Sequence, residues 1–223
     1  MDFFQQYQQA LQQNQPAEAL QYLQKHLSSH RQHDAGFYLL DNLLRSLARA
    51  PEALRAYHEA CRLNPNVSDY HLNLGVTYQG LQQPEKALQA YQQAYQVAPC
   101  PEIRGNIAQA LLLAGRYETG WPEYEWRMKV PSHRPIFEWY PPERHWQGQP
   151  FPGETLVVYH EQGLGDDLQF CRYLPYVKAL GGKVIFSTKK SLMPIMASVY
   201  GVDQVVEHST ETFATLPFRW AVP

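Results

Sequence analysis

The chain has 223 residues, of which 44% are hydrophobic and 18% are charged, and its formal net charge is −2. This composition is typical of a folded globular protein and excludes a disordered chain. Because lysine and arginine are not in excess, we expect neither nucleic acid nor an anionic membrane surface as a partner.

We expect neither a secretory signal nor a membrane-spanning helix among these residues. The first residues include Asp2 and repeated glutamines in place of the basic and apolar segments of a secretory signal. No apolar run approaches the roughly 20 residues of a membrane-spanning helix. The cysteines Cys61, Cys100 and Cys171 are far apart and odd in number, which favours reduced thiols. We therefore expect a cytoplasmic protein without a membrane span.

A repeat of 34 residues runs through the N-terminal half of the chain. The best-formed unit, residues 68–101, has small and large apolar residues at fixed positions, followed by a proline: Leu74, Gly75, Tyr78, Ala87, Tyr91, Ala94 and Pro99. Residues 34–67 repeat these types 34 positions earlier, except that Asp41 stands in place of glycine. A degenerate unit precedes these two, and a fourth unit, shifted by one residue, follows them.

This pattern resembles the tetratricopeptide repeat (TPR), in which pairs of helices stack into a solenoid. Small residues let the two helices of a pair approach closely, while tyrosine and leucine fill the space between pairs. A single pair is not stable alone, and about four pairs exceed the usual minimum of roughly three repeats. We therefore expect a mainly α-helical chain with a TPR solenoid of about four helix pairs over residues 1–130.

The first helices of stacked repeats line a concave groove, which such scaffolds use for recognition. Asn73 and Asn106 occupy the same face one repeat apart, and Asn42 lies one turn beyond the equivalent position. A row of asparagine amides can hold the backbone of an extended peptide. The row resembles the asparagine ladder in the TPR superhelix of protein O-GlcNAc transferases. Alternatively, these asparagines bond to neighbouring helix backbones.

Two other patterns in the helical part are weaker indications of a binding site. Arg45 and Arg104 could belong to a clamp for a C-terminal carboxylate, but no regular set of lysines and asparagines accompanies them. His26, His30 and His33 have a spacing that could hold a metal ion, yet they fall at a helix end in a polar, glutamine-rich stretch. We expect a solvated helix terminus there, and we predict no metal and no cofactor.

Residues 131–152 form a connector in which repeated prolines exclude a long helix. The connector and its flank are too aromatic for a flexible linker, with Trp126, Phe137, Trp139, Tyr140 and Trp146. We expect these rings to strap the solenoid onto the following domain, with a sugar-stacking platform as the alternative.

Residues 153–223 predict a small, partial Rossmann-like α/β domain. Strands are expected at TLVVYH, GGKVIFST and residues 204–206, and helices at 191–200 and along an apolar stripe that begins at Leu168 and ends at Leu180. The turn GLGDD is not the dinucleotide-binding fingerprint, because Leu168 takes the place of its third glycine, so a nicotinamide or flavin enzyme is excluded.

Ligands of parallel sheets bind beyond the carboxyl ends of the strands. The candidate acceptor-binding turn at that place contains Glu161, Gln162, Gly163 and Gly165, with Arg172 nearby. The alternative is a purely structural turn.

Two segments, GRYETGWPEYEWR and HWQGQPFPGETLVVYHEQGLGDDLQFCRYLPYVKALGG, resemble bacterial TPR proteins whose C-terminal part is similar to the heptosyltransferase-type GT-B glycosyltransferases. The resemblance implies that Asp166 is the base that deprotonates an acceptor hydroxyl, which a carboxylate near a helix N-terminus can do. It also implies that Glu161 and Arg172 orient that acceptor.

A GT-B enzyme has two Rossmann-like halves, and its C-terminal half binds most of the nucleotide-sugar donor. About three strands of the first half are expected here, so whether this chain is an enzyme stays open. One function is a protein-interaction scaffold that binds an extended peptide; the other is the N-terminal portion of a TPR-coupled glycosyltransferase that presents a protein or glycan acceptor. An open three-stranded sheet would also offer an edge for self-association.

Overall fold

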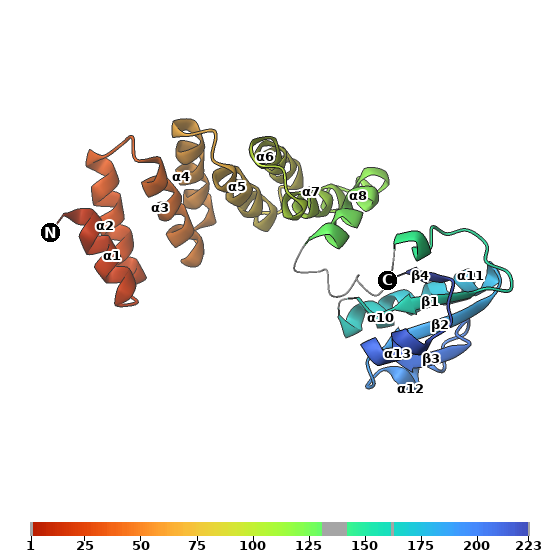
Figure 1. Cartoon of the computed structure of the whole chain (residues 1–223). Helices are drawn as coiled ribbons and strands as arrows, with labels where there is room; N and C mark the ends of the chain where they lie inside the picture. Colours follow the sequence, from red (N-terminus) through yellow and green to blue (C-terminus); the bar gives the residue numbers. More distant parts are fainter. Residues whose placement is uncertain (1, 131–141, 162, 223) are drawn as a thin grey trace. The chain divides into compact units, whose positions relative to one another are not determined.

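The computed structural model describes residues 2–130, 142–161 and 163–222. The chain divides into two compact units, Met1–Val130 and Pro131–Pro223. The first unit is built of helices, and the second contains a small sheet (Figure 1). Over these described ranges, no helix has both the length and the apolar surface needed to cross a membrane.

The described part of the first unit contains four consecutive helix pairs, which confirm the predicted solenoid. They are α1 (Phe3–Gln12) with α2 (Pro16–Ser29), α3 (Asp34–Ser46) with α4 (Ala50–Leu63), α5 (Ser68–Gly80) with α6 (Pro84–Val97), and α7 (Pro101–Leu113) with α8 (Tyr117–Tyr124). A short 3-10 helix, η1 (Glu125–Lys129), continues α8.

The turn inside each pair has the same backbone geometry in all four pairs. One residue of each turn has a left-handed backbone, with φ of 56° at Asn14, 58° at Ala48, 57° at Gln82 and 75° at Gly115. The next amide donates a hydrogen bond to the carbonyl five residues earlier, as in the 2.8 Å bond from Arg49 to Leu44. This bond closes a Schellman motif, which satisfies the carbonyls at a helix end.

Close packing within the pairs depends on small side chains. Four alanines at repeat positions are completely buried: Ala53, Ala60, Ala87 and Ala94. A Cβ atom added at Gly75 would lie only 2.4 Å from the Tyr91 ring. Asp41, which stands at the equivalent place one repeat earlier, is also completely buried.

The expectation of a solvated helix terminus was wrong for His26, whereas His30 is exposed and His33 is half-buried. His26 is only 8% exposed, because its ring packs 5.1 Å from the Phe4 ring of α1. Its Nε2 lies 3.0 Å from Nδ1 of His33, and the His30 ring stacks on it at 4.2 Å. Burial, followed by the nearby His30 and His33, lowers the pKa of His26. His26 is therefore buried within the first helix pair, although its neighbours in the sequence are polar.

The described part of the second unit holds a four-stranded parallel sheet in the order β3-β2-β1-β4 (Figure 1). Its strands are β1 (Thr155–Tyr159), β2 (Lys183–Thr188), β3 (Gln204–Glu207) and β4 (Trp220–Val222). The expectation of three strands was wrong, because the C-terminal residues form α13 (Thr210–Thr215) and β4. A strand of three residues is too short to show an alternating pattern.

The helix expected between β1 and β2 is broken into α10 (Leu164–Phe170), a 3-10 turn η4 (Cys171–Tyr173) and α11 (Leu174–Ala179). Pro175 accounts for the break, because it has no amide hydrogen and its ring crowds the carbonyl of residue 171. Leu168, in α10, is 47% exposed rather than part of a buried stripe. The helix expected at 191–200 shrinks to α12 (Met193–Met196).

Both faces of the sheet carry apolar packing. On one face, Leu156 and Val184 pack with Leu174 of α11 and Met196 of α12. On the other face, Val157, Ile185 and Ala221 pack with Phe213 of α13, in a separate hydrophobic cluster. The sheet is thus the middle layer of this unit.

The edge of the sheet that β4 forms, next to β1, is not open. Beyond β4, His145 forms a parallel bridge with Ala221, and the Trp146 amide donates a 2.9 Å hydrogen bond to the Ala221 carbonyl. The Trp146 indole also packs edge-on against Phe151, which is completely buried in the α/β unit. The second half of the expected connector, including η3 (Pro142–Arg144), thus contacts the α/β unit. Phe137, Trp139 and Tyr140 lie outside the described residues.

Candidate functional sites

The first helices of the pairs present a row of polar side chains. Asn73 on α5 donates from Nδ2 to the Asp69 carbonyl at 2.8 Å and to the Tyr38 hydroxyl at 3.3 Å. Asn42 on α3 accepts a 3.1 Å hydrogen bond from the Tyr57 hydroxyl. Both asparagines therefore have partners within the solenoid, in keeping with the structural alternative. We refer to Tyr38, Asn42, Arg45, Tyr57 and Asn73 as the concave polar cluster.

The same kind of contact recurs in the next repeat. Arg45 Nη1 lies 3.4 Å from the Tyr57 hydroxyl, and Gln79, which is 34 residues later, accepts from the Tyr91 hydroxyl at 3.1 Å. Gln79 in turn donates to Gln109 on α7 at 3.4 Å. A buried tyrosine hydroxyl thus supports one polar residue of the first helix in each of these repeats.

Asn106 differs from the other two asparagines. It lies on α7, is half-buried, and within the described residues its amide makes no hydrogen bond. Arg104, two residues earlier, is engaged instead, because Nη1 lies 3.1 Å from Glu123 and the guanidinium lies 4.3 Å from the centre of the Trp126 ring. Among the predicted groove residues, Asn106 is therefore the amide best placed to accept a new partner.

Asp41 is a buried acid with an unusual environment. It is 0% exposed, and neither carboxyl oxygen has a hydrogen-bond partner within 3.5 Å in the described residues. Burial raises the pKa of this carboxyl to about 7, although the Tyr57 hydroxyl and the Arg45 charge oppose the shift. At neutral pH much of Asp41 is therefore protonated, which limits the cost of burying it.

The second candidate site lies where strands β1, β2 and β3 end. His160 follows β1, Thr188 ends β2, and His208 follows β3. The amides of His160 and His208 donate 2.8 Å hydrogen bonds to the Ser187 and Thr188 carbonyls, so both histidines extend the sheet. Parallel α/β sheets bind their ligands at this place, beyond the carboxyl ends of the strands.

A buried polar network joins these strand ends to α10. Asp167 is 7% exposed; its Oδ1 lies 2.9 Å from Nδ1 of His160, and its Oδ2 accepts a hydrogen bond from the Thr188 hydroxyl. Nδ1 of His208 lies 3.1 Å from the Ser187 hydroxyl. Burial, with the nearby His160, lowers the pKa of His208. We call Asp167, His160, Ser187, Thr188 and His208 the strand-end network.

The residues predicted for this edge have different surroundings. Asp166 is exposed, and its Oδ2 accepts a 2.9 Å hydrogen bond from the Gly163 amide. Gly163 and Gly165 are exposed as well, Glu161 is half-buried, and Gln162 lies outside the described residues. Arg172 is exposed on η4, with its guanidinium 5.2 Å from the Tyr173 ring centre.

Two adjacent aspartates therefore have opposite roles. Asp167 is buried and ties α10 to two strands, whereas Asp166 keeps its carboxylate in solvent at the start of α10. The strand-end network was not predicted from the sequence. A usable signal exists, because His160 and His208 each directly follow a β-rich run.

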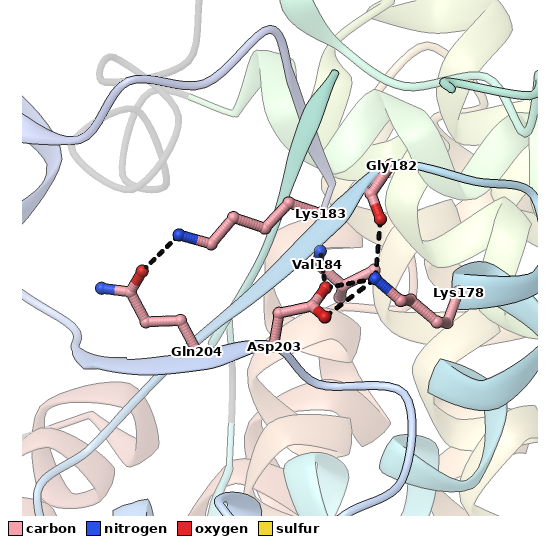
Figure 2. Close-up of polar contacts among 6 residues, drawn as sticks. All are labelled: Lys178, Gly182, Lys183, Val184, Asp203 and Gln204. Carbon is pink, nitrogen blue, oxygen red and sulfur yellow. Dashed lines mark hydrogen bonds and ion pairs between the residues drawn. The ribbon is translucent and has the colours of Figure 1, made fainter. Parts of the chain in front are cut away.

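At the opposite ends of the strands, where β2 and β3 begin, charged side chains join neighbouring elements (Figure 2). Lys178 on α11 donates to both carboxylate oxygens of Asp203, at 2.8 and 2.6 Å, and to the Gly182 carbonyl at 2.7 Å. The Val184 amide donates to the same Asp203 carboxylate at 2.7 Å. This cluster fixes α11 and the start of β3 to β2, which is a structural role.

Comparison with known proteins agrees with the helical geometry. A tetratricopeptide-repeat family model matches residues 68–99. A crystal structure of MamA resembles the chain with a TM-score of 0.55 and 17% identity, covering 60% of this chain and 79% of that one. A MamA RS-1 double mutant gives a TM-score of 0.55 at 18% identity, covering 59% of this chain and 74% of that one.

A longer relative matches both units. Protein FlbA of Caulobacter vibrioides is 29% identical over 216 residues, which cover 93% of this chain. The chain spans only 36% of the length of FlbA. The repeat period, the four helix pairs with their shared turns, and the match of residues 68–99 lead to one conclusion: the helical unit is a TPR-like solenoid in which residues 68–99 match a tetratricopeptide repeat.

Proposed function

We propose that the chain is a protein-interaction scaffold whose first helices bind an extended peptide. The tetratricopeptide fold supports this class of function, because stacked repeats offer a long concave surface. The observation that carries the proposal is the succession of polar side chains from α3 through α5 to α7, namely Arg45, Asn73, Gln79, Gln109 and Asn106. Amides and a guanidinium can bond to a peptide backbone or side chain.

The hydrogen bonding of Asn73 and Asn106 indicates which of the two gives the clearer test. Asn73 already bonds within the scaffold, so its replacement would also disturb Tyr38 and Arg45. The side-chain amide of Asn106 makes no hydrogen bond within the described residues, so its replacement removes a binding group with little effect on the fold. Asn106→Ala is therefore the cleaner variant of the groove.

The experiment starts from a phage-displayed library of random 12-residue peptides, selected against the full chain. Selected peptides are synthesised, and their Kd values are measured by fluorescence anisotropy. Asn106→Ala should weaken binding about three- to tenfold, the effect of one or two hydrogen bonds. Gln96→Ala, at an exposed position of the second helix α6, is the matched control and should leave Kd unchanged. Equal affinity for wild type and Asn106→Ala would contradict the proposal.

A second candidate function concerns the α/β unit. We propose, as the alternative, that this unit is the first part of a GT-B-type glycosyltransferase and that the solenoid presents a protein or glycan acceptor to it. The strand order β3-β2-β1-β4 supports this, because it matches the first strands of a doubly wound sheet. The exposed Asp166 in the first turn of α10 also supports it, because an exposed carboxylate can accept the proton of an attacking hydroxyl.

This alternative is tested with a panel of radiolabelled nucleotide sugars and the full chain. Transfer to protein or to a glycan acceptor that is lost in Asp166→Asn would establish it, whereas transfer that persists in Asp166→Asn would contradict the role of Asp166 as the base. A cytoplasmic location completes the proposal and is favoured by three cysteines without disulfide bonds.

A further inference from the structure

Arg45 occupies a central position in the concave polar cluster. It extends from α3 to α5, both first helices, because its Nη1 lies 3.3 Å from Oδ1 of Asn73. The same nitrogen lies 3.4 Å from the Tyr57 hydroxyl of α4. Both contacts are long for hydrogen bonds and both partners are uncharged. The positive charge of Arg45 is therefore held in place but not neutralised by them.

The rest of the guanidinium is available. Nε and Nη2 of Arg45 make no hydrogen bond within the described residues, and neither atom is among the buried polar atoms that lack a partner. Both nitrogens therefore reach solvent. The Nε and Nη2 hydrogens point along one edge of the guanidinium, and this edge matches the two oxygens of a carboxylate.

Other arginines of the solenoid show a contrasting pattern. Within the described residues, four of them have a carboxylate partner within 3.1 Å: Arg49 with Glu52, Arg62 with Glu59, Arg104 with Glu123, and Arg127 with Glu125. Arg45 has no such ion pair in this part of the chain, although it is half-buried among polar groups. An unpaired, partly desolvated guanidinium is a strong recognition group for an anion.

The acid nearest in sequence does not supply the missing charge. Asp41 lies one helical turn before Arg45, but it is completely buried and forms no ion pair with it. Among the described residues, the charged or titratable groups that act on Asp41 are Tyr57 of α4 and Arg45 of its own helix, and none comes from α2 or α5. Because burial keeps much of Asp41 protonated at neutral pH, Asp41 offsets the charge of Arg45 only in part.

We propose that Arg45 is the anchor for an acidic side chain, aspartate or glutamate, of the peptide that the concave face binds. The inference rests on the proposed peptide-binding function and assigns the partner a chemistry: an extended segment with a carboxylate at the position facing α3 and α5.

The test compares acidic peptides with neutral versions of the same peptides. Amidated, acetylated versions of the selected 12-residue peptides are made with each Asp or Glu replaced by Asn or Gln. The acidic form should bind wild type about tenfold more tightly, and this preference should vanish in Arg45→Gln. Arg55→Gln, which removes the same charge from an exposed position of the second helix α4, should keep the preference.

The outcomes distinguish the role of Arg45 from the proposed peptide-binding function. Equal binding of acidic and neutral peptides would overturn the role of Arg45, while the peptide-binding function stands as long as Asn106→Ala still weakens binding. Recovery of no peptide from the library would overturn both. If Arg45→Gln does not fold, the Arg45 Nε–Hε signal of the wild type, followed by NMR, decides: it should shift with the acidic peptide and not with its neutral version.

Discussion

Gly75 on α5 packs directly against the ring of Tyr91 on α6, with so little space that a Cβ atom at Gly75 would lie 2.4 Å from Cε1 and 2.5 Å from Cδ1 of that ring. Tyr91 is 1% exposed and donates a hydrogen bond to Gln79, so its ring cannot move aside without losing this bond. The contact sets how closely the two helices of the third pair approach.

Gly75→Ala should therefore destabilise the solenoid by about 1–3 kcal/mol, the usual cost of overpacking a core. The free energy of unfolding is measured by urea titration with far-UV circular dichroism. Gly105→Ala is the matched control, because a Cβ there meets nothing within 4 Å and alanine favours helix, so about 0.5–1 kcal/mol of added stability is expected. A stabilising Gly75→Ala would show that Tyr91 does not limit the helix approach.

The shared turns give a prediction with opposite signs at two equivalent positions. Ala48 has φ of 58°, a left-handed conformation that costs a non-glycine residue about 1 kcal/mol, while Gly115 adopts φ of 75° with no such cost. Ala48→Gly should raise the free energy of unfolding by up to about 1 kcal/mol, and Gly115→Ala should lower it by a similar amount. Thermal unfolding of both variants checks this; two changes of the same sign would rule out the shared turn geometry as the cause.

Asp41 should make the stability of the solenoid depend on pH. Its folded pKa of about 7 lies above the ordinary value of 3.8, so the folded state holds more protons than the unfolded state between these values. Stability from this group is therefore greatest at low pH and is lost as pH rises toward 7. The expected loss between pH 5 and pH 8 is about 2.5 kcal/mol.

This loss is read as the difference between wild type and Asp41→Asn in urea titrations at both pH values, which cancels the histidines that titrate in the same range. Asparagine cannot ionise, so the variant should lack the decline. A wild type that runs parallel to Asp41→Asn from pH 5 to pH 8 would mean that Asp41 has an ordinary pKa in the folded protein.

The two adjacent aspartates of α10 should differ in their effect on stability. Asp167→Ala removes a buried carboxylate that bonds to His160 and Thr188 and leaves both of these groups without their partner, at a cost of about 3 kcal/mol. Asp166→Ala removes only an exposed bond to the Gly163 amide, at a cost of about 1 kcal/mol or less. Tryptophan fluorescence during urea unfolding reports both changes, and similar costs would contradict the division of roles.

Much of the helical unit could be read from the sequence, because its packing repeats every 34 residues. Gly75 and the buried alanines need only their neighbours in the same or the next pair, so a local pattern of small and large residues records the contacts. The degenerate first pair shows the limit of this, since Asn14 keeps the shared turn although the surrounding residues have lost the pattern.

The α/β unit was less predictable, because its contacts join residues that are far apart in the chain. Strand β4 exists through pairing with β1, where Trp220 lies beside Leu156, and three residues alone carry too little pattern to reveal it. The sequence pointed to Asp166 at the strand-end edge, but only the folded sheet brings Asp167 to Thr188, 21 residues away.

The sequence by itself thus determined the repeat, its period and the polar character of the first helices, since these depend on helical spacing and side-chain size. Only the tertiary structure decided which polar groups are already engaged. Asn73 bonds to Tyr38 and Arg45 of the preceding repeat, whereas one edge of the Arg45 guanidinium stays open. The reason is that hydrogen bonding depends on distances between helices, which are set by packing and not by position in the chain.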